Sequence, residues 1–92
     1  MKSDGIKLFI LIEASKLADD SVTIDTWDTE TATKMLEMYA KRKKWNDENE
    51  ERYSMRTSFM FRKIVLYPYT KNVCSWRTDI NEIKEIAEEE TK

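Results

Sequence analysis

Residues 8–12, Leu8-Phe9-Ile10-Leu11-Ile12, form a continuous apolar run near the start of the chain. A run this short predicts a strand that lies in the centre of a sheet or is covered on both faces. Residues 21–27 are rich in β-branched side chains and alternate, so a second strand is expected there with Val22 and Ile24 on one face. The polar residues 15–20 between them predict a turn. The two segments together indicate an antiparallel hairpin.

The clearest helical pattern follows this hairpin. Asp28 is the expected N-cap, and Glu30 would lie in the first turn, where the helix dipole favours a negative charge. Apolar residues then recur at the spacing of one helix face, namely Ala32, Met35, Leu36, Tyr39 and Ala40. The cations at 41–44 suit a helix C-terminus, and Trp45 is expected to mark its end. The polar residues 46–51 predict a loop.

From Tyr53 the apolar pattern changes to a period of two, which is typical of a strand. One face is expected to hold Tyr53, Met55, Thr57, Phe59 and Phe61. Arg56 and Arg62 fall on the opposite face. The apolar residues 64–67 break the alternation, which indicates either a bulge or a strand buried on both sides. Pro68 should end this strand because it cannot donate to the ladder, and residues 73–76 predict a short returning strand.

The last predicted element is a helix that begins at Thr78 or Asp79. Asp79 and Glu82 have the spacing of a capping box. A narrow apolar stripe follows, formed by Ile80, Ile83, Ile86 and Ala87. Three glutamates at 88–90 oppose the helix dipole, so fraying is expected over 88–92. We therefore expect residues 1–92 to form a single domain with a frayed tail.

The predicted order is strand, strand, helix, strand, strand, helix. It favours an α+β fold, a small antiparallel sheet of three to four strands with two helices on one face. A faint internal similarity supports this order. Residues 27–30 and 76–79 share the pattern Trp-x-Thr-acid, and both lie at a predicted strand-to-helix junction.

The composition excludes several kinds of chemistry. With 92 residues, one glycine, one cysteine and no histidine, the chain cannot build a phosphate-binding glycine loop, a histidine-based catalytic site or a thiolate zinc site. The acidic clusters at 19–20 and 25–30 are explained by turn formation and helix capping. No catalytic residue, metal site or cofactor is therefore expected. We expect a cytoplasmic protein without a membrane segment, since the apolar run at 6–12 is short for a signal peptide.

Charge is distributed unevenly along the chain although the net charge is −2. Residues 1–40 carry a charge of −4, residues 41–77 carry +6, and residues 78–92 carry −4. The basic middle also holds seven of the ten aromatic residues. This segregation indicates either a binding surface or internal pairing, in which the acidic last helix lies near the basic strands.

The leading functional hypothesis is a small non-catalytic module that binds another protein. Trp and Met are abundant for so small a core, and Trp, Tyr, Met and Arg are enriched in interfaces. The expected contact residues are Trp27, Trp45, Trp76, Arg56 and Arg62. In size and composition the chain is similar to the small accessory proteins of phages and mobile elements, which often inhibit a host protein. A homodimer could form by strand-edge pairing near Pro68 or residues 73–76.

The alternative hypothesis is a protein that binds single-stranded nucleic acid through the segment 41–77. Cations neutralise phosphates while aromatic rings stack on bases. The expected contacts would be Lys41, Arg42, Lys43, Lys44, Arg56, Arg62 and Lys63. Two observations weigh against it. The predicted strand places Arg62 on the face opposite Phe59, and the sequence pI of about 5.2 is low for a nucleic-acid-binding domain.

Overall fold

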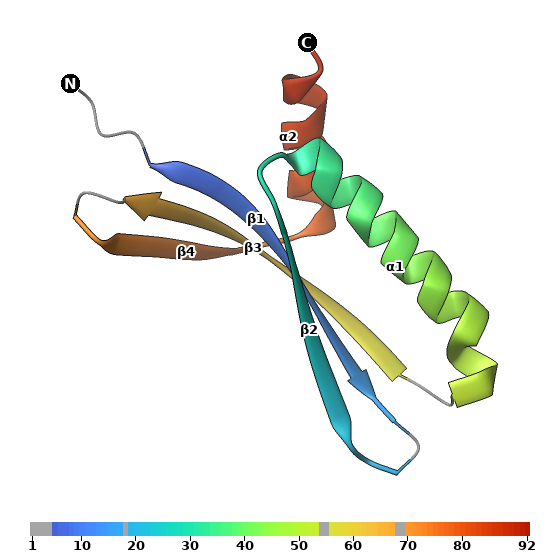
Figure 1. Cartoon of the computed structure of the whole chain (residues 1–92). Coiled ribbons are helices and arrows are strands. Elements are labelled where there is room, and N and C mark those ends of the chain that lie inside the picture. The colour runs from blue at the N-terminus through green and yellow to red at the C-terminus, as the bar shows by residue number, and fades with distance from the viewer. Residues whose placement is uncertain (1–4, 18, 54–55, 68–69) are drawn as a thin grey trace.

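Four strands and two helices follow one another in the order ββαββα, which confirms the predicted α+β class. The computed structural model describes residues 5–17, 19–53, 56–67 and 70–92. Its elements are β1 (Ile6–Lys16), β2 (Val22–Thr29), α1 (Ala32–Tyr53), β3 (Arg56–Tyr67), β4 (Asn72–Thr78) and α2 (Ile80–Glu90). Figure 1 shows a strongly twisted sheet with the helices beside it.

The strands form one antiparallel sheet in the order β2-β1-β3-β4, so the apolar run that begins the chain is central, as predicted. β1 pairs with β3 without interruption from the pair Ile6–Leu66 to the pair Lys16–Arg56. This continuous register excludes a bulge after residue 63. β2 flanks the C-terminal half of β1, and β4 flanks the C-terminal half of β3. The two outer strands therefore lie at opposite ends of the central pair (Figure 1).

Three rows of four residues cross the whole sheet, and the central one runs through its middle. Ile10 pairs with Arg62 in the centre, Asp28 pairs with Ile10 on one side, and Arg77 pairs with Arg62 on the other. The similar segments noted in the sequence, 27–29 and 76–78, therefore occupy equivalent places on either side of the Ile10–Arg62 pair. The two hairpins, β1–β2 and β3–β4, are thus related by an approximate two-fold axis through this pair.

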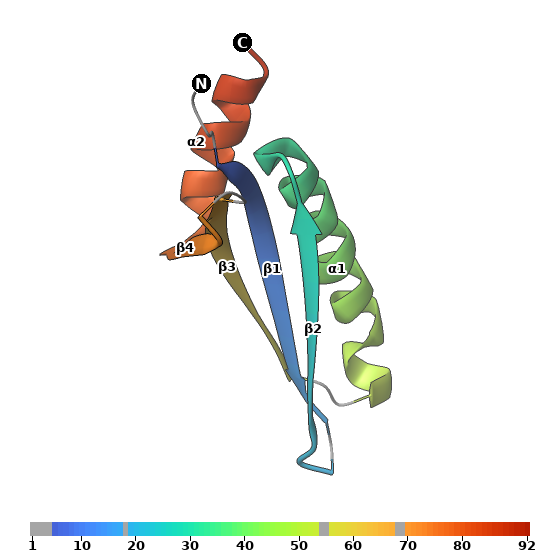
Figure 2. The same cartoon turned by 60° about the vertical axis from the view of Figure 1, so that its left-hand side comes forward.

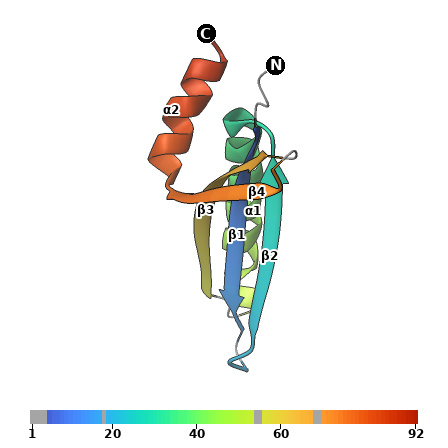
Figure 3. The ribbon, with the colours of Figure 1, turned by 90° about the vertical axis from the view of Figure 1, so that its left-hand side faces the viewer.

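Both helices cover the same face of the sheet. Along β1 the alternate residues Phe9, Leu11, Glu13 and Ser15 are buried, whereas the residues between them are only partly buried. The buried set faces the helices, because Phe9 and Leu11 cluster with Met35 of α1 and Ile83 of α2. Figure 2 shows α1 running along β2 and β1. Figure 3 looks onto the other face, with α1 behind the strands.

The hydrophobic core is small and lies where the two helices meet the sheet. It consists of Phe9, Leu11, Ala32, Met35, Phe61, Ile83 and Ala87. Tyr39 packs edge-on against Phe59 and Phe61, with ring centroids 5.2 Å apart in both pairs. The apolar stripes predicted on both helices are thus confirmed as core-facing, except at Ala40, which is exposed.

The first helix differs from the prediction at both ends. Asp28 belongs to β2 and pairs with Ile10, so its predicted role as N-cap is wrong. Thr31 takes that place, and its hydroxyl accepts a hydrogen bond from the Lys34 amide at 3.2 Å. The helix then runs to Tyr53, so the loop predicted for 46–51 and the end predicted at Trp45 are also wrong. The chain there is polar but rich in good helix formers.

The second helix begins as predicted and is joined to the first at its far end. Asp79 is the N-cap and accepts a hydrogen bond from the Glu82 amide. α2 continues past residue 88 to Glu90, whose carboxylate accepts from the amides of Ala32 and Thr33 at 2.8 and 2.9 Å. Although desolvation acts to raise the pKa of Glu90, these hydrogen bonds bring it below its ordinary value of 4.5. A residue of α2 thus satisfies free donors at the start of α1.

Replacing Glu90 with Ala is expected to lower the free energy of unfolding by about 1 kcal/mol, because two N-terminal amides of α1 lose their acceptor. Solvent screening of this exposed carboxylate keeps the effect from being larger. The measurement is urea denaturation at pH 7. Glu89→Ala is the matched control, since its carboxylate has no hydrogen bond or ion pair within the described part of the chain. Equal effects of the two changes would contradict the capping role.

Candidate functional site

The three tryptophans expected to contact a partner do not share one surface. Trp45 on α1 and Trp76 on β4 are 41% and 48% exposed, whereas Trp27 on β2 is half-buried. The Arg42 guanidinium lies over the rings of both Trp27 and Trp45, with its carbon 5.1 and 4.9 Å from the two ring centroids. Their rings are therefore partly committed to contacts within the protein.

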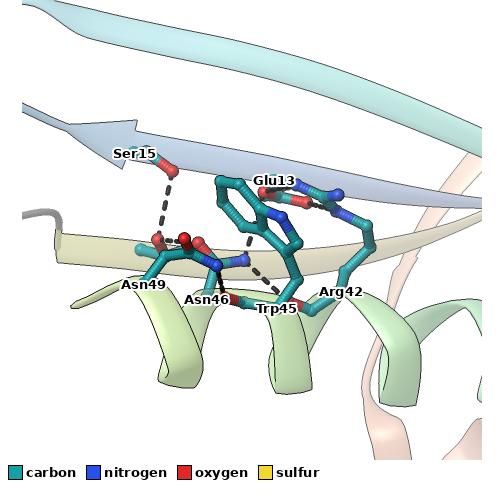
Figure 4. Close-up of polar contacts among 7 residues, drawn as sticks. Glu13, Ser15, Arg42, Trp45, Asn46 and Asn49 are labelled. Carbon is teal, nitrogen blue, oxygen red and sulfur yellow. Dashed lines mark hydrogen bonds and ion pairs between the residues drawn. The ribbon is translucent and has the colours of Figure 1, made fainter. Parts of the chain in front are cut away.

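Arg42 is held by a buried carboxylate on the neighbouring strand. Its Nε donates to Glu13 Oε1 at 2.6 Å and a terminal nitrogen donates to Oε2 at 2.8 Å. This bidentate pair joins α1 to β1 at the end of the sheet away from the apolar core (Figure 4). Glu13 is only 3% exposed. Arg42, which the alternative hypothesis assigns to nucleic-acid binding, is thus paired within the protein.

Three further side chains extend this network into the sheet. Asn46 Nδ2 donates to Glu13 Oε2 at 3.2 Å and to the Arg42 carbonyl at 2.8 Å. Thr57 donates its hydroxyl to Asn46 Oδ1 at 2.8 Å. Because the Thr57 hydroxyl proton is donated to Asn46, Ser15 is the donor in the 3.1 Å hydrogen bond between the Ser15 and Thr57 hydroxyl groups. We call Glu13, Ser15, Arg42, Asn46 and Thr57 the polar network (Figure 4).

The electrostatics of the polar network favour the charged form of Glu13. The hydrogen bonds from Arg42, ahead of the opposing effect of burial, hold the pKa of Glu13 below its ordinary value of 4.5. The same contact raises the pKa of Arg42. Because these groups satisfy one another, the network is suited to fixing α1 on the sheet. Within the described residues, no cluster of three or more Cys, Asp or Glu side chains is arranged to hold a metal ion.

The most exposed apolar surface lies on the face of the sheet that the helices leave uncovered. We call it the open face. It comprises Val22, Ile24, Thr26 and Asp28 of β2, Ile6, Leu8, Ile10, Ile12, Ala14 and Lys16 of β1, Ser58, Met60, Arg62, Ile64 and Leu66 of β3, and Val73, Ser75 and Arg77 of β4. Among the side chains that the structure describes, five of the seven large apolar ones that are exposed belong to this face: Ile6, Val22, Ile24, Met60 and Val73.

Lys16 is a charged residue at the end of β1 on the open face, where it pairs with Val22. The other charged side chains described on this face lie in the row that crosses all four strands. Arg62 and Arg77 are cross-strand neighbours on the β3–β4 side, and Asp28 lies on the β2 side. Arg62 Nε donates to Ser75 Oγ at 2.7 Å, which directs its guanidinium toward β4. Of the expected contact residues, Arg62 is thus on the open face. Arg56 starts β3, and its side chain lies outside the described part.

The residues assigned to nucleic-acid binding are dispersed. Lys63 pairs with Glu82 of the acidic α2, as the internal-pairing alternative predicts. Lys41, Lys43 and Lys44 are exposed on α1. Phe59 and Phe61 face the helices, so the predicted separation of Arg62 from these rings is confirmed. Among the aromatic residues in the described segments, none belongs to the open face.

The polar network escaped sequence analysis, although one signal for it was present. Glu13 and Ser15 continue the alternation of Phe9 and Leu11 toward the helices. Their partners are distant in sequence and are polar residues that ordinarily lie in solvent.

Neither described helix is both long and apolar enough to cross a membrane. Comparisons of the chain with protein-family models, with curated proteins and with solved structures find no match.

Proposed function

We propose that the protein is a small non-catalytic interaction module whose open face is the surface that binds another protein. One observation carries the proposal: the uncovered side of the sheet is largely apolar. Antiparallel sheets that face water on one side ordinarily alternate apolar and polar residues. Here Ile10, Ile12 and Ile64 stand on the side away from the helices.

The shape of the protein supports the same proposal. The smallest dimension of the chain is 15 Å, and its radius of gyration is 15.5 Å. A compact domain of this length has a radius of gyration of about 12 Å. Two-layer folds bury the apolar face of each layer against another, and here the sheet has a covering layer on one face only. A partner on the open face would supply the missing layer.

The mode of action that we propose is binding alone, in the cytoplasm, without catalysis. Size and composition suggest an accessory protein of a phage or mobile element that modulates or inhibits a host protein. Such a function agrees with a chain that offers one large apolar surface. Trp45 and Trp76 are exposed outside the open face and would be secondary contacts.

Replacing Met60 with Lys tests the proposal, because it places a charge in the middle of the open face at a residue that is already 39% exposed. In affinity purification with the tagged protein as bait, the stoichiometric partner is expected to fall at least tenfold. Ala40→Lys is the matched control, since it adds the same charge to an exposed site on α1. Circular dichroism melts should show both variants folded.

Equal retention of the partner by both variants would show that the open face is not the binding surface. A salt series with labelled single-stranded RNA and DNA addresses the alternative. If affinity were high at low salt, fell steeply with added salt, and lost that slope when Lys41, Lys43 and Lys44 were neutralised, nucleic-acid binding would replace our proposal.

A further inference from the structure

The charge pattern of the open face fits a second copy of the same face. We infer that the protein forms a symmetric dimer in which two open faces stack, with the two-fold axis parallel to the strands and passing between β1 and β3. This inference rests on the proposed function, because it names the partner of that same surface. It differs from the strand-edge dimer expected from the sequence, in which backbone groups of an outer strand would pair.

The row Asp28–Ile10–Arg62–Arg77 spans the sheet from β2 to β4. An acid stands at one end of this row and two bases stand at the other. A two-fold axis parallel to the strands exchanges the two edges of the stacked sheets. It therefore sets Asp28 of each subunit opposite Arg77 of the other. Two such contacts arise from one operation, and both join opposite charges.

The other two-fold axis that keeps the strands of the two sheets aligned runs across them, and the charges disfavour it. That axis places each strand over its own copy. Asp28 would then face the second Asp28, and Arg77 would face the second Arg77. Like charges set against each other in an interface are strongly unfavourable. Of the two arrangements that keep the strands of the stacked sheets aligned, the positions of Asp28, Arg62 and Arg77 favour the axis parallel to the strands.

The apolar rows on either side of the charged row support the same arrangement. Ile12 pairs with Met60 in one row, and Leu8 pairs with Ile64 in the other. Exchange of β1 with β3 across the axis sets Ile12 over Met60 and Leu8 over Ile64, each contact occurring twice. The centre of the interface is therefore aliphatic, as the interior of a β-sandwich requires.

Among the described side chains, Arg62 is the one charged residue near the axis in the middle of the interface, because Lys16 lies at the end of β1, where it pairs with Asp20. The conformation of Arg62 suits the interface. The hydrogen bond from its Nε to Ser75 Oγ turns the guanidinium away from the axis and toward β4. Asp28 of the second subunit would lie on that side. Each Asp28 carboxylate would consequently meet the guanidinium groups of Arg62 and Arg77, which leaves the axis itself to the aliphatic part of Arg62.

The size of the open face is adequate for a stable dimer. The strands contain 7 to 12 residues each. Because β2 and β4 flank opposite ends of the central pair, β2 of one subunit overlaps β4 of the other only near the charged row. At about 3.3 Å per residue and about 4.8 Å between strands, the stacked part of the sheet presents about 450 Å² in projection. A standard interface buries about 800 Å² of accessible surface per partner, and side chains make the accessible area larger than the projection.

Charge exchange between Asp28 and Arg77 tests the inference. Sedimentation equilibrium of the full chain at low salt should show a dimer. Asp28→Arg and Arg77→Asp, each alone, are expected to weaken it at least tenfold, and the double variant to restore affinity to within about threefold of the parent. Asp47→Arg, the same change on an exposed residue of α1, should leave the dimer unchanged. All four variants alter exposed side chains, and melting curves check their folding.

The outcomes separate the two proposals. A parent chain that is monomeric at 100 µM overturns the dimer; the proposed function still stands if Met60→Lys releases a different protein partner in the purification. A dimer that Met60→Lys leaves intact overturns the dimer through the open face. A dimer weakened by both single changes but not restored by the double variant overturns the axis parallel to the strands.

Discussion

The Ile83→Ala variant is expected to unfold with a free energy about 3 kcal/mol below that of the parent protein. Ile83 on α2 is fully buried and belongs to the core where both helices meet the sheet. Its truncation removes buried methyl groups and leaves a cavity, which together cost about 2–5 kcal/mol. In a chain of this size the melting temperature should fall by roughly 15 °C, measured by circular dichroism.

Ile86→Ala is the matched control, because it makes the same chemical change one turn further along α2. Ile86 is only partly buried against the core. Helix propensity changes equally in both variants, so the difference between them reports burial alone. We expect Ile86→Ala to lower the free energy of unfolding by about 1 kcal/mol. Equal destabilisation by the two variants would contradict the position assigned to α2.

The order of elements could be predicted because local patterns and tertiary structure agree there. The run at 8–12 is apolar on both faces and forms the central strand. The capping box of Asp79 lies at the true start of α2, and Pro68 follows directly after the last residue of β3. The alternation that set Arg62 apart from Phe61 was also correct. In each case neighbouring residues in sequence carry the whole signal.

The errors occurred where polar residues take part in long-range structure. The C-terminal half of α1 has few apolar residues, so its periodicity stops before the helix does. Asn46, within that half, is buried through hydrogen bonds to Glu13 and Thr57. Such contacts depend on partners 33 and 11 residues away, and no local pattern encodes them. The start of α1 was misplaced because Asp28 is equally acceptable as a cap and on an outer strand.

The open face was predicted in part, since two helices were expected on one face of the sheet and Arg62 on the face opposite Phe59 and Phe61. The residues of β1 and β3 that form it could be assigned to one side of each strand. Which side the helices cover depends on Phe9, Leu11 and Phe61 packing with Met35 and Ile83. Only this choice of side leaves Ile12 and Met60 uncovered.

Replacing Arg42 with Met is expected to lower the free energy of unfolding by about 3 kcal/mol at pH 7. The Glu13 carboxylate would lose both hydrogen bonds from the guanidinium and remain buried with Asn46 as its main donor. Removing one partner of a buried ion pair costs about 3–5 kcal/mol. Arg42 itself is partly exposed, so the lower end of that range applies. Urea denaturation at pH 7 provides the measurement.

This loss should depend on pH with a definite sign. In the parent protein the pKa of Glu13 is below its ordinary value of 4.5, so its stabilising contribution is present above that pH and is lost as the pH falls through the folded-state pKa. In the Arg42→Met variant burial dominates and raises the pKa of Glu13. The variant then gains stability from protonation of Glu13 as the pH falls. The difference between the two proteins should shrink between pH 7 and pH 4.

The double variant Glu13→Leu with Arg42→Met completes the test. Removing both charges leaves no buried ion without a partner, and a well-packed apolar pair of similar volume is often as stable as the ion pair it replaces. We therefore expect the double variant to recover most of the stability lost by Arg42→Met alone, with no dependence on pH from this site. The double variant could instead be as unstable as Arg42→Met alone, with the same difference from the parent at pH 4 and pH 7. The destabilisation would then come from the lost contacts of the Arg42 guanidinium with Trp27 and Trp45. The buried charge of Glu13 would then have no part in holding α1 on the sheet.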